Sequence, residues 1–504
     1  GSEMCIRDSY YMKDEELTAA RDKYELTGYP YLNIGSEDFQ TNSGKGNEYT
    51  SNSVFGRVIY SYADRYLFQA NVRHDGSSRF AKGYRWGTFP SFSAGWVMSE
   101  EKFMKNLNWD WLSFLKLRGS WGMLGNERIG DNYFPYIALM SFGNSLFYMA
   151  DGSVVSDKTA RPAVLAVEDI TWETTTSTDI GLDANFFNNR LQFHFDYYWK
   201  QTKDMLLNIE IPYFMGYNNP STNAGKMSTH GYDIELAWND RIGDFKYGVN
   251  LNFSDFLSKI DYMNDGEQIS GGKIKRAGVL FNEYYGYVCD GIYQTQEEVN
   301  NSARTSTTVT VGDLKYRDIS GPDGVPDGII SPEYDRVPLG NSLPRFQYGG
   351  TFNASYKGID FSIAFQGIGK QNSYLSTAMV QPLRDNFGNV PSILEGKYWS
   401  PFNTAEENLS AKYPRLSNVS KNNNYATSSF WMFNGSYFRL KNLTLGYTLP
   451  ETWTQKAGIN RVRFYVSGSD LFCLSNFPDG WDPEMSYKAY PITTSLVMGL
   501  QVNF

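Results

Sequence analysis

The sequence predicts an all-β fold: part of an antiparallel transmembrane β-barrel, with about 13–14 strands of the ~9–11 residues that such barrels use. Apolar and polar residues alternate along many segments of that length. Aromatic residues make up 16% of the chain, yet its mean hydropathy is -0.46. A barrel reconciles these two values, because only every second residue of a strand faces lipid. A helical membrane protein would need an apolar run of about 18 residues, and the sequence contains none.

The alternation is clearest in the terminal stretch, YPITTSLVMGLQVNF at 490–504. Small or polar residues separate the members of one row, which are Ile492, Thr494, Leu496, Met498, Leu500, Val502 and Phe504. A period of two indicates a strand with one apolar face and one wet face. A soluble sheet could end in the same way, so the other strands decide between membrane and water.

The same pattern recurs along the chain from residue 54 onward. Between Leu191 and Trp199 an aromatic apolar row alternates with Gln192, His194 and Asp196. Further strands are expected at 54–62, 66–75, 91–98, 115–123, 179–186, 232–238, 245–253, 346–356, 359–366, 437–449 and 461–474. The charged face of these strands fits a watery lumen, and it would equally fit the outer face of a soluble sandwich.

The connections between these strands alternate in length, which favours the barrel. Short turns are expected near 63, 188, 242 and 357, and long loops near 125–170, 262–345 and 370–433. Two connections depart from this, because 99–111 is longer than a tight turn and 76–86 is only moderate in length. Outer-membrane barrels sort their loops in this way, with short periplasmic turns and long outer loops. Aromatic residues near strand ends, such as Tyr60, Tyr62 and Trp238, fit an interfacial girdle.

Residues 1–50 are expected to be a polar, irregular segment, with a short helix at Asp14–Lys23 and a strand near Tyr24–Leu32. No signal peptide is visible, because GSEMCIRDS has no apolar core. An exported protein must have one, so we expect the chain to be a fragment of a longer protein. Residues 4–9, MCIRDS, also resemble a translated sequencing adapter. We hypothesise that the first residues are a cloning or assembly artefact, which the encoding DNA would reveal.

Several segments resemble the SusC/RagA family of TonB-dependent outer-membrane transporters. They are GRVIYSYADRYLFQANVRHDGSSRF at 56–80, RWGTFPSFSAGWVMSEEKFM at 85–104, LKLRGSWGMLGN at 115–126, GDLKYRDISGPDGVPDG at 312–328, YFRLKNLTLGYTLP at 437–450 and the terminal strand. The resemblance implies that residues 51–504 form the C-terminal portion of a plugged barrel of about 22 strands, with long extracellular loops. The plug and the first strands are not expected in this chain.

The resemblance also implies a location and a set of partners. The chain would lie in the outer membrane of a Gram-negative, Bacteroidetes-like cell, in contact with outer-membrane lipid. A SusD-like surface lipoprotein would cover it, and TonB would supply energy through the missing plug. The cargo would be oligosaccharides or peptides. By similarity to other outer-membrane barrels, the barrel-assembly machinery would recognise Leu500, Val502 and Phe504 of the terminal strand.

One loop offers a candidate metal site. Asp318, Ser320, Asp323 and Asp327 are closely spaced between glycines. Oxygen ligands at such spacing suit a hard cation such as calcium, although the spacing is not that of an EF-hand. Asp and Gly are also common turn formers, so a turn-rich outer loop without metal is the interpretation that we favour. No other cofactor is expected.

The remaining residues indicate neither catalysis nor nucleic-acid binding. The sequence contains no GxSxG, HExxH or P-loop motif, so we expect no enzyme. The net charge of -9 argues against nucleic acid. Loop aromatics could stack on sugars, pack the loops together or contact a lid; they are Trp399, Tyr413, Trp431 and Trp481. Two alternatives to the importer stay open: a self-contained, porin-like passive barrel, and a secreted β-rich carbohydrate-binding module.

Overall fold

One large antiparallel sheet makes up most of the molecule. The computed structural model describes residues 4–24, 28, 31–128, 133–138, 140–162, 164–209, 211–264, 266–375, 381–383, 390, 392–455, 458–485, 490 and 492–504. Within these ranges fourteen strands pair in the order β1-β2-β3-β4-β5-β8-β9-β10-β11-β18-β19-β22-β23-β24. The prediction of an all-β antiparallel sheet with about 13–14 long strands is confirmed.

The strands of this sheet are long, as a membrane-spanning sheet requires. They are β1 (Met4–Arg21), β2 (Gln40–Tyr62), β3 (Tyr66–Ser77), β4 (Trp86–Val97), β5 (Leu112–Asn126), β8 (Glu173–Phe186), β9 (Leu191–Asn208), β10 (Ser221–Ile242), β11 (Phe245–Met263), β18 (Arg345–Tyr356), β19 (Ile359–Lys370), β22 (Tyr437–Thr448), β23 (Arg461–Ser475) and β24 (Ser495–Asn503).

The connections lie at two ends of the sheet according to their length. One end, here called the short-turn end, carries the turns between β2 and β3, β8 and β9, β10 and β11, and β18 and β19. Lys357 and Gly358 both have positive φ, 45° and 89°, which is the backbone of a type I′ hairpin turn. The other end, here called the long-connection end, carries the segments 127–172, 264–344 and 371–436. The predicted sorting of loop lengths is therefore confirmed.

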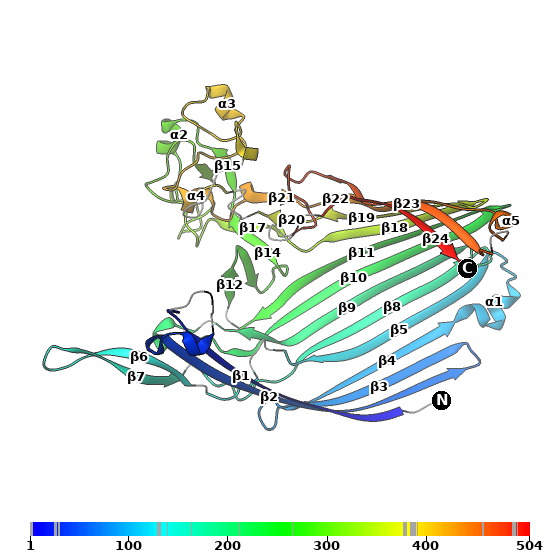
Figure 1. Ribbon diagram of the computed structural model, residues 1–504, viewed down its shortest axis with the longest axis horizontal. Coiled ribbons are helices and arrows are strands. Elements are labelled where there is room, and N and C mark those ends of the chain that lie inside the picture. Colours follow the sequence, from blue (N-terminus) through cyan, green and yellow to red (C-terminus); the bar gives the residue numbers. More distant parts are fainter. Residues whose placement is uncertain are drawn as a thin grey trace.

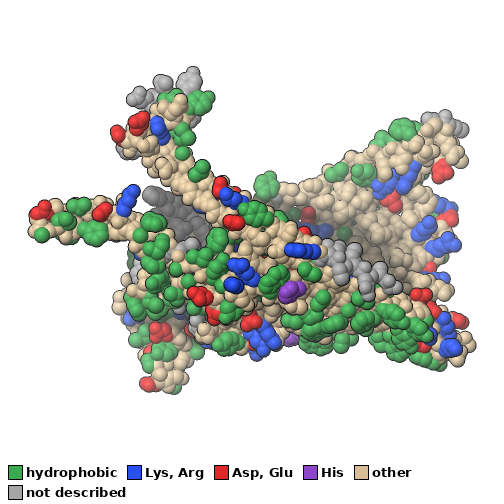
Figure 2. All heavy atoms as spheres, turned by 90° about the horizontal axis from the view of Figure 1, so that it is seen from below, with side chains coloured by type: hydrophobic (Ala, Val, Ile, Leu, Met, Phe, Trp, Pro, Cys, Tyr) green, Lys and Arg blue, Asp and Glu red, His purple; other side chains and the backbone are tan. Residues whose placement is uncertain are grey.

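The sheet curls into an open trough (Figure 1). Its outer strands, β1 and β24, do not pair with each other. Along each strand the apolar row faces outward: Phe195 of β9 lies beside Leu182 of β8 and Ile234 of β10. Figure 2 shows hydrophobic side chains in a broad band, charged side chains gathered at the short-turn end, and the hollow of the trough. Many outward side chains are highly exposed, including Ile180 at 53% and Met498 at 76%.

The expectation for residues 10–50 is wrong. Residues 4–21 form β1, and β2 begins at Gln40, so the boundary expected at residue 50 falls inside a strand. Most of the helix expected at Asp14–Lys23 is instead part of a strand that pairs with β2, from Asp14 opposite Asn47 to Arg21 opposite Gln40. Hydrogen bonding along this ladder overrides the weak helical propensity of a polar segment. Most of the strand expected at Tyr24–Leu32 lies outside the described residues.

Two of the long connections fold together into one compact unit, which we call the loop cap (residues 264–344 and 371–436). Its strands are β12 (Glu267–Ser270), β13 (Lys273–Arg276), β14 (Glu283–Tyr287), β15 (Cys289–Ile292), β16 (Leu314–Tyr316), β17 (Arg336–Asn341), β20 (Asn372–Tyr374) and β21 (Met432–Asn434). Its helices are α2 (Gln296–Asn301), α3 (Ala405–Leu409), α4 (Lys421–Asn424) and the 3-10 turns η5 (Ser392–Leu394) and η6 (Ser429–Trp431). Figure 1 shows this unit projecting beyond the trough.

The remaining elements are short. A separate hairpin, β6 (Met140–Tyr148) and β7 (Val154–Pro162), projects from the long-connection end (Figure 1). The others are η1 (Leu32–Ile34), η2 (Glu37–Phe39), η3 (Met98–Glu100), α1 (Lys102–Asn106), η4 (Tyr213–Met215) and α5 (Glu451–Thr454). In the described part of the chain, no helix has the length and apolar character needed to cross a membrane.

Candidate functional site

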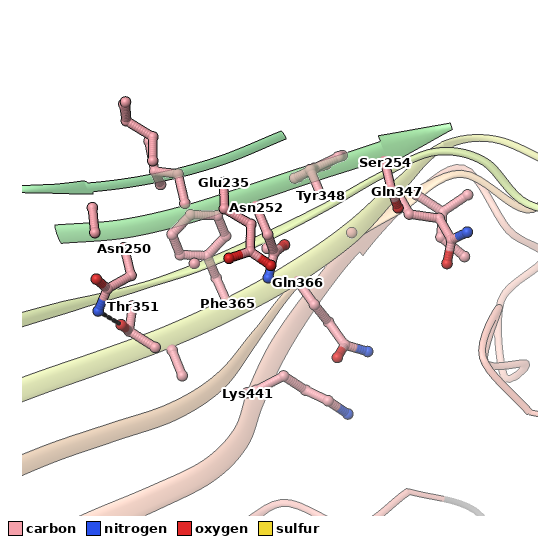
Figure 3. A pocket seen from close by; sticks show the side chains of 18 of the residues that line it. Glu235, Asn250, Asn252, Ser254, Gln347, Tyr348, Thr351, Phe365, Gln366 and Lys441 are labelled. Carbon is pink, nitrogen blue, oxygen red and sulfur yellow. Dashed lines mark hydrogen bonds between the residues drawn. The ribbon is translucent and has the colours of Figure 1, made fainter. Parts of the chain in front are cut away.

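The concave face of the trough is a polar wall. Strands β9, β10, β11, β18, β19 and β22 line a cavity of about 870 Å³ on this face. The polar lining side chains are Gln192, His194, Glu235, Asn250, Asn252, Ser254, Gln347, Thr351, Gln366 and Lys441. Figure 3 shows Glu235, Asn252, Gln366 and Lys441 projecting from the sheet into the same open space. The wall arises because strand alternation sends every polar row of these strands to one side.

Neutral amides and hydroxyls dominate this wall, and such groups both donate and accept hydrogen bonds. Asn250 Nδ2 donates to Thr351 Oγ1 at 3.1 Å, and Gln366 Nε2 donates to the Tyr437 hydroxyl at 3.2 Å. The arrangement can hold an uncharged, hydrogen-bonding solute or polypeptide. The sequence assigned no substrate-binding residues, although the polar rows of the predicted strands were the signal that could have found this wall.

Farther around the trough, charges on the same face neutralise one another. Arg118 of β5 donates from Nε to Asp183 of β8 at 3.1 Å and from Nη2 to Asp196 of β9 at 2.6 Å. His194 Nδ1 lies 3.0 Å from the Asp183 carboxylate. Each of these carboxylates thus has a nearby cation or imidazole. Such a partner offsets the cost of placing a charged group on a half-buried surface. Period-two alternation predicts His194 and Asp196 on the wet face, and it does not indicate which residues pair with them.

A second charge cluster fastens the β23–β24 connection to the wall. The Arg439 side chain is only 4% exposed and makes ion pairs with Asp482 and Glu484 of that connection. Lys441 Nζ donates to Asp470 at 2.8 Å and to Glu484 at 3.2 Å. A bulge between Leu440 and Asn442 turns Lys441 toward these carboxylates, as bulges commonly re-aim a side chain.

The loop cap is held together by a buried polar network. Asp313 is fully buried and accepts from Arg415 Nε and from the Ser420 hydroxyl, both at 2.7 Å. Asn424 Nδ2 donates to the same carboxylate at 2.9 Å. Because Asp313 belongs to one long connection and its partners belong to the other, the network joins two segments about a hundred residues apart.

The loop aromatics named from the sequence pack the connections together. Trp431 is fully buried, and its ring centroid lies 4.9 Å from that of Phe430 and 5.7 Å from that of Tyr425. Trp399 is 8% exposed and donates from Nε1 to Gln294 at 3.2 Å. Tyr413 and Trp481 pack against the cluster around Trp431. Of the three possibilities that the sequence left open, the packing of loops is the one that the structure supports.

Cys289 lies inside the loop cap. Burial raises the pKa of its thiol to about 11, so the thiol stays protonated at neutral pH. Cys289 and Cys473 are both free thiols in the described part of the chain.

The candidate calcium residues make turns. Asp318 Oδ2 accepts from the Gly328 amide at 2.7 Å, and Asp327 Oδ1 accepts from the Ile329 amide at 2.9 Å. The sequence missed Asp335, which is fully buried and accepts from the Ile319 amide at 2.7 Å. Among the described residues, no three His, Cys, Asp or Glu side chains gather closely enough to hold a metal ion. Calcium binding by this loop stays a prediction of the sequence.

We expect millimolar calcium to leave the thermal midpoint of the protein unchanged, because the Asp318 and Asp327 carboxylates already accept backbone amides. Differential scanning fluorimetry in detergent, with and without EGTA, measures this. A ligand that binds only the folded state would raise the midpoint. A calcium-dependent rise that Asp323→Ala abolishes, and that Asp157→Ala in β7 leaves intact, would establish the site instead.

Leu500 and Val502 of the expected assembly signal lie on the edge strand β24 (Ser495–Asn503), and Phe504 directly follows it. Val502 is opposite Val462 of β23, and Leu500 is opposite Phe464. Leu500 is 58% exposed and Phe504 is 86% exposed. Phe504 and the start of β1 both lie at the short-turn end (Figure 1).

A curved sheet with an apolar outer face, a polar concave face and connections sorted by length is the wall of an outer-membrane β-barrel. The sequence matches the family described as TonB dependent receptor-like, beta-barrel, over residues 9–467. The chain therefore belongs to the TonB-dependent receptor β-barrel family. This membership places the chain in the outer membrane, as the sequence predicted. It excludes the alternative of a secreted β-rich carbohydrate-binding module.

Individual relatives agree with this family. The chain is 31% identical to "TonB-dependent receptor P3" of Formosa agariphila, over 90% of this chain and 45% of that protein. It is 30% identical to "TonB-dependent receptor SusC" of Bacteroides thetaiotaomicron, over 90% of this chain and 43% of that protein. The solved structure of the RagAB peptide transporter covers 100% of this chain with a TM-score of 0.78 at 23% identity, and 53% of that chain is matched. The chain spans about half the length of these curated relatives, which are receptors by name.

Proposed function

We propose that the chain forms the C-terminal part of the wall of a TonB-energised outer-membrane importer. The observation that carries the proposal is the neutral polar wall on the concave face of a sheet whose outer face is apolar. Oligosaccharides and peptides both present hydroxyl, amide and carbonyl groups, which Asn, Gln, Ser and Thr side chains can match. A SusD-like surface lipoprotein and TonB, acting through a plug, complete the transporter.

The passive, porin-like barrel is the second candidate. A barrel complete in itself would pair its first and last strands, because closure alone removes sheet edges. Here β1 and β24 have no such pairing, which favours the wall of a larger barrel.

The β6–β7 hairpin supports a partner at the long-connection end. Cross-strand pairing puts Phe142, Leu146 and Tyr148 on one face, and these side chains are 81%, 72% and 85% exposed. The opposite face carries Ser145 opposite Asp157 and Phe147 opposite Val155, and its apolar side chains are less exposed, at 46% and 44%. A two-stranded hairpin is at best marginally stable alone in water, so its apolar face fits a protein partner. We propose that the surface lipoprotein covers it.

Two measurements on cells that make the receptor carrying this chain test the proposal. Uptake of fluorescent maltodextrins or fluorescent casein peptides should stop when an uncoupler collapses the proton-motive force. The receptor with Phe142→Asp and Leu146→Asp should lose its co-purifying lipoprotein, whereas Ser145→Asp on the opposite face should keep it. Uptake that an uncoupler leaves unchanged would favour the passive barrel. Equal retention of the lipoprotein by both variants would remove the hairpin from the interface.

Assembly provides a separate prediction. An exposed strand edge can bind a partner by strand addition, with alternate side chains giving specificity. We propose that the barrel-assembly machinery reads Leu500, Val502 and Phe504 in this way. Deleting Phe504 should lower the outer-membrane level of the receptor and leave its synthesis unchanged, as measured by pulse labelling and membrane fractionation. Asn503→Asp, on the other row, is the control. Normal insertion without Phe504 would leave the residue as one more exposed aromatic.

A further inference from the structure

The β4–β5 connection at the short-turn end, residues 98–111, carries an exposed apolar surface. Phe103 of α1 is 51% exposed, Leu107 is 47% exposed, and Trp109 and Trp111 are 43% and 46% exposed. Four large apolar side chains on one connection are therefore exposed, and exposed apolar surface of this kind often marks a contact site.

This surface continues the outward row of the sheet. The Phe103 ring lies 6.4 Å from that of Trp96, which stands on the outward face of β4. The Trp109 and Trp111 rings stack at 5.3 Å, and Trp111 stacks on Phe186 of β8 at 5.8 Å. The two aromatic groups lie on the same outward face, where Leu117 of β5 stands between Trp96 of β4 and Leu182 of β8.

Glu101 fixes the connection in this position. Its side chain is 11% exposed and accepts from Arg65 Nη1 at 2.9 Å, from the Tyr66 hydroxyl at 2.5 Å and from Trp96 Nε1 at 3.2 Å. Tyr66 and Trp96 are cross-strand neighbours on β3 and β4. Three donors from the sheet therefore hold the start of α1 against the outward wall.

We infer that residues 98–111 are an interfacial anchor that binds the phospholipids of the inner, periplasmic leaflet. Because the exposed side chains continue the outward, lipid-facing row of the sheet, we take lipid to be what contacts them. Short turns mark the periplasmic end of such barrels. Trp and Phe next to exposed cations are typical of segments that lie in the headgroup region; Lys102 and Lys105 stand on the same turn, and Lys105 pairs with Glu100 at 2.6 Å. Four side chains fall short of the roughly 800 Å² per partner of a stable protein interface. The inference rests on the proposed placement of the barrel.

Photo-crosslinking tests the anchor in the full receptor in its own outer membrane. Phe103→p-benzoylphenylalanine is irradiated, and adducts are identified by mass spectrometry. The same photoreactive residue at position 195, on the outward row of β9, is the positive control for lipid contact. At position 244 it is the negative control, because Asp244 lies at the same end but lines a cavity with Lys246 and Asp360.

We expect phospholipid adducts from positions 103 and 195, several-fold above those from position 244. Glu101→Ala should lower the adduct yield at position 103 about threefold, because Arg65, Tyr66 and Trp96 lose the carboxylate that accepts their hydrogen bonds. Glu101→Gln should restore the yield. Protein adducts or lipopolysaccharide adducts at 103, or lipid adducts that Glu101→Ala does not reduce, would overturn the inference. Absence of lipid adducts at both 103 and 195 would instead contradict the proposed barrel placement. Absence at 103 alone would contradict only the anchor.

Discussion

Replacing Asp313 by alanine should destabilise the loop cap by about 3–5 kcal/mol, the usual cost of removing one partner of a buried ion pair. The substitution strands the Arg415 guanidinium, whose side chain is 25% exposed, next to the donors of Ser420 and Asn424. Those donors lose the carboxylate that satisfied them, and unsatisfied buried donors are costly.

Native-state proteolysis of the detergent-solubilised receptor at low protease concentration measures this effect, because cleavage that is slow relative to reclosing follows the population of the locally opened state. We expect faster cleavage within 264–344 and 371–436, while the fourteen-stranded sheet stays resistant. The matched control is Asp290→Ala, which removes an ion pair with Arg317 whose side chain is 59% exposed. An exposed pair contributes only about 0–1 kcal/mol.

A double variant separates the stranded charge from a general loss of packing. Replacing both Asp313 and Arg415 by leucine and methionine should recover part of the resistance, since apolar pairs of similar volume often substitute for buried ion pairs, while Ser420 and Asn424 still lack the carboxylate. Equal cleavage of the Asp313→Ala and Asp290→Ala receptors would show that the two connections are not held by this network.

Phe195→Arg should block assembly of the receptor, whereas His194→Arg should be tolerated. A cation on the lipid face near the bilayer midplane costs roughly 2–4 kcal/mol, and lumen positions accept charge. Phe195 lies between Leu182 and Ile234 on the outward row. His194 stands on the polar face, where an arginine would still lie beside Asp183.

Outer-membrane fractionation of cells that make each variant measures the effect, with equal synthesis checked by pulse labelling. We expect a large loss of membrane-inserted receptor for Phe195→Arg and a near-normal level for His194→Arg. Equal loss for both variants would refute the assignment of faces. Normal levels for both would place residue 195 outside the bilayer.

Much of the sheet could be predicted from the sequence because its information is local. Period-two alternation from Leu191 to Trp199 defines both a strand and its faces, and turn chemistry at Lys357-Gly358 defines a hairpin. Family resemblance over separate segments then supplied the class of protein. Where alternation is weak and polar, as at Asp14–Lys23, the same reasoning failed, since only pairing with β2 makes that segment a strand.

Local patterns were thus enough to predict every strand of the large sheet except β1, its two faces, the sorting of connections and the family. Tertiary structure alone decided which distant side chains meet. Asp313 and Arg415 are about a hundred residues apart, and no spacing rule joins them. The same holds for Arg439 with Asp482, for Glu101 with Arg65 and Tyr66, and for the polar wall that six strands share. Periodicity is a property of neighbours along the chain, whereas these contacts depend on how the sheet curls and how its long connections fold back.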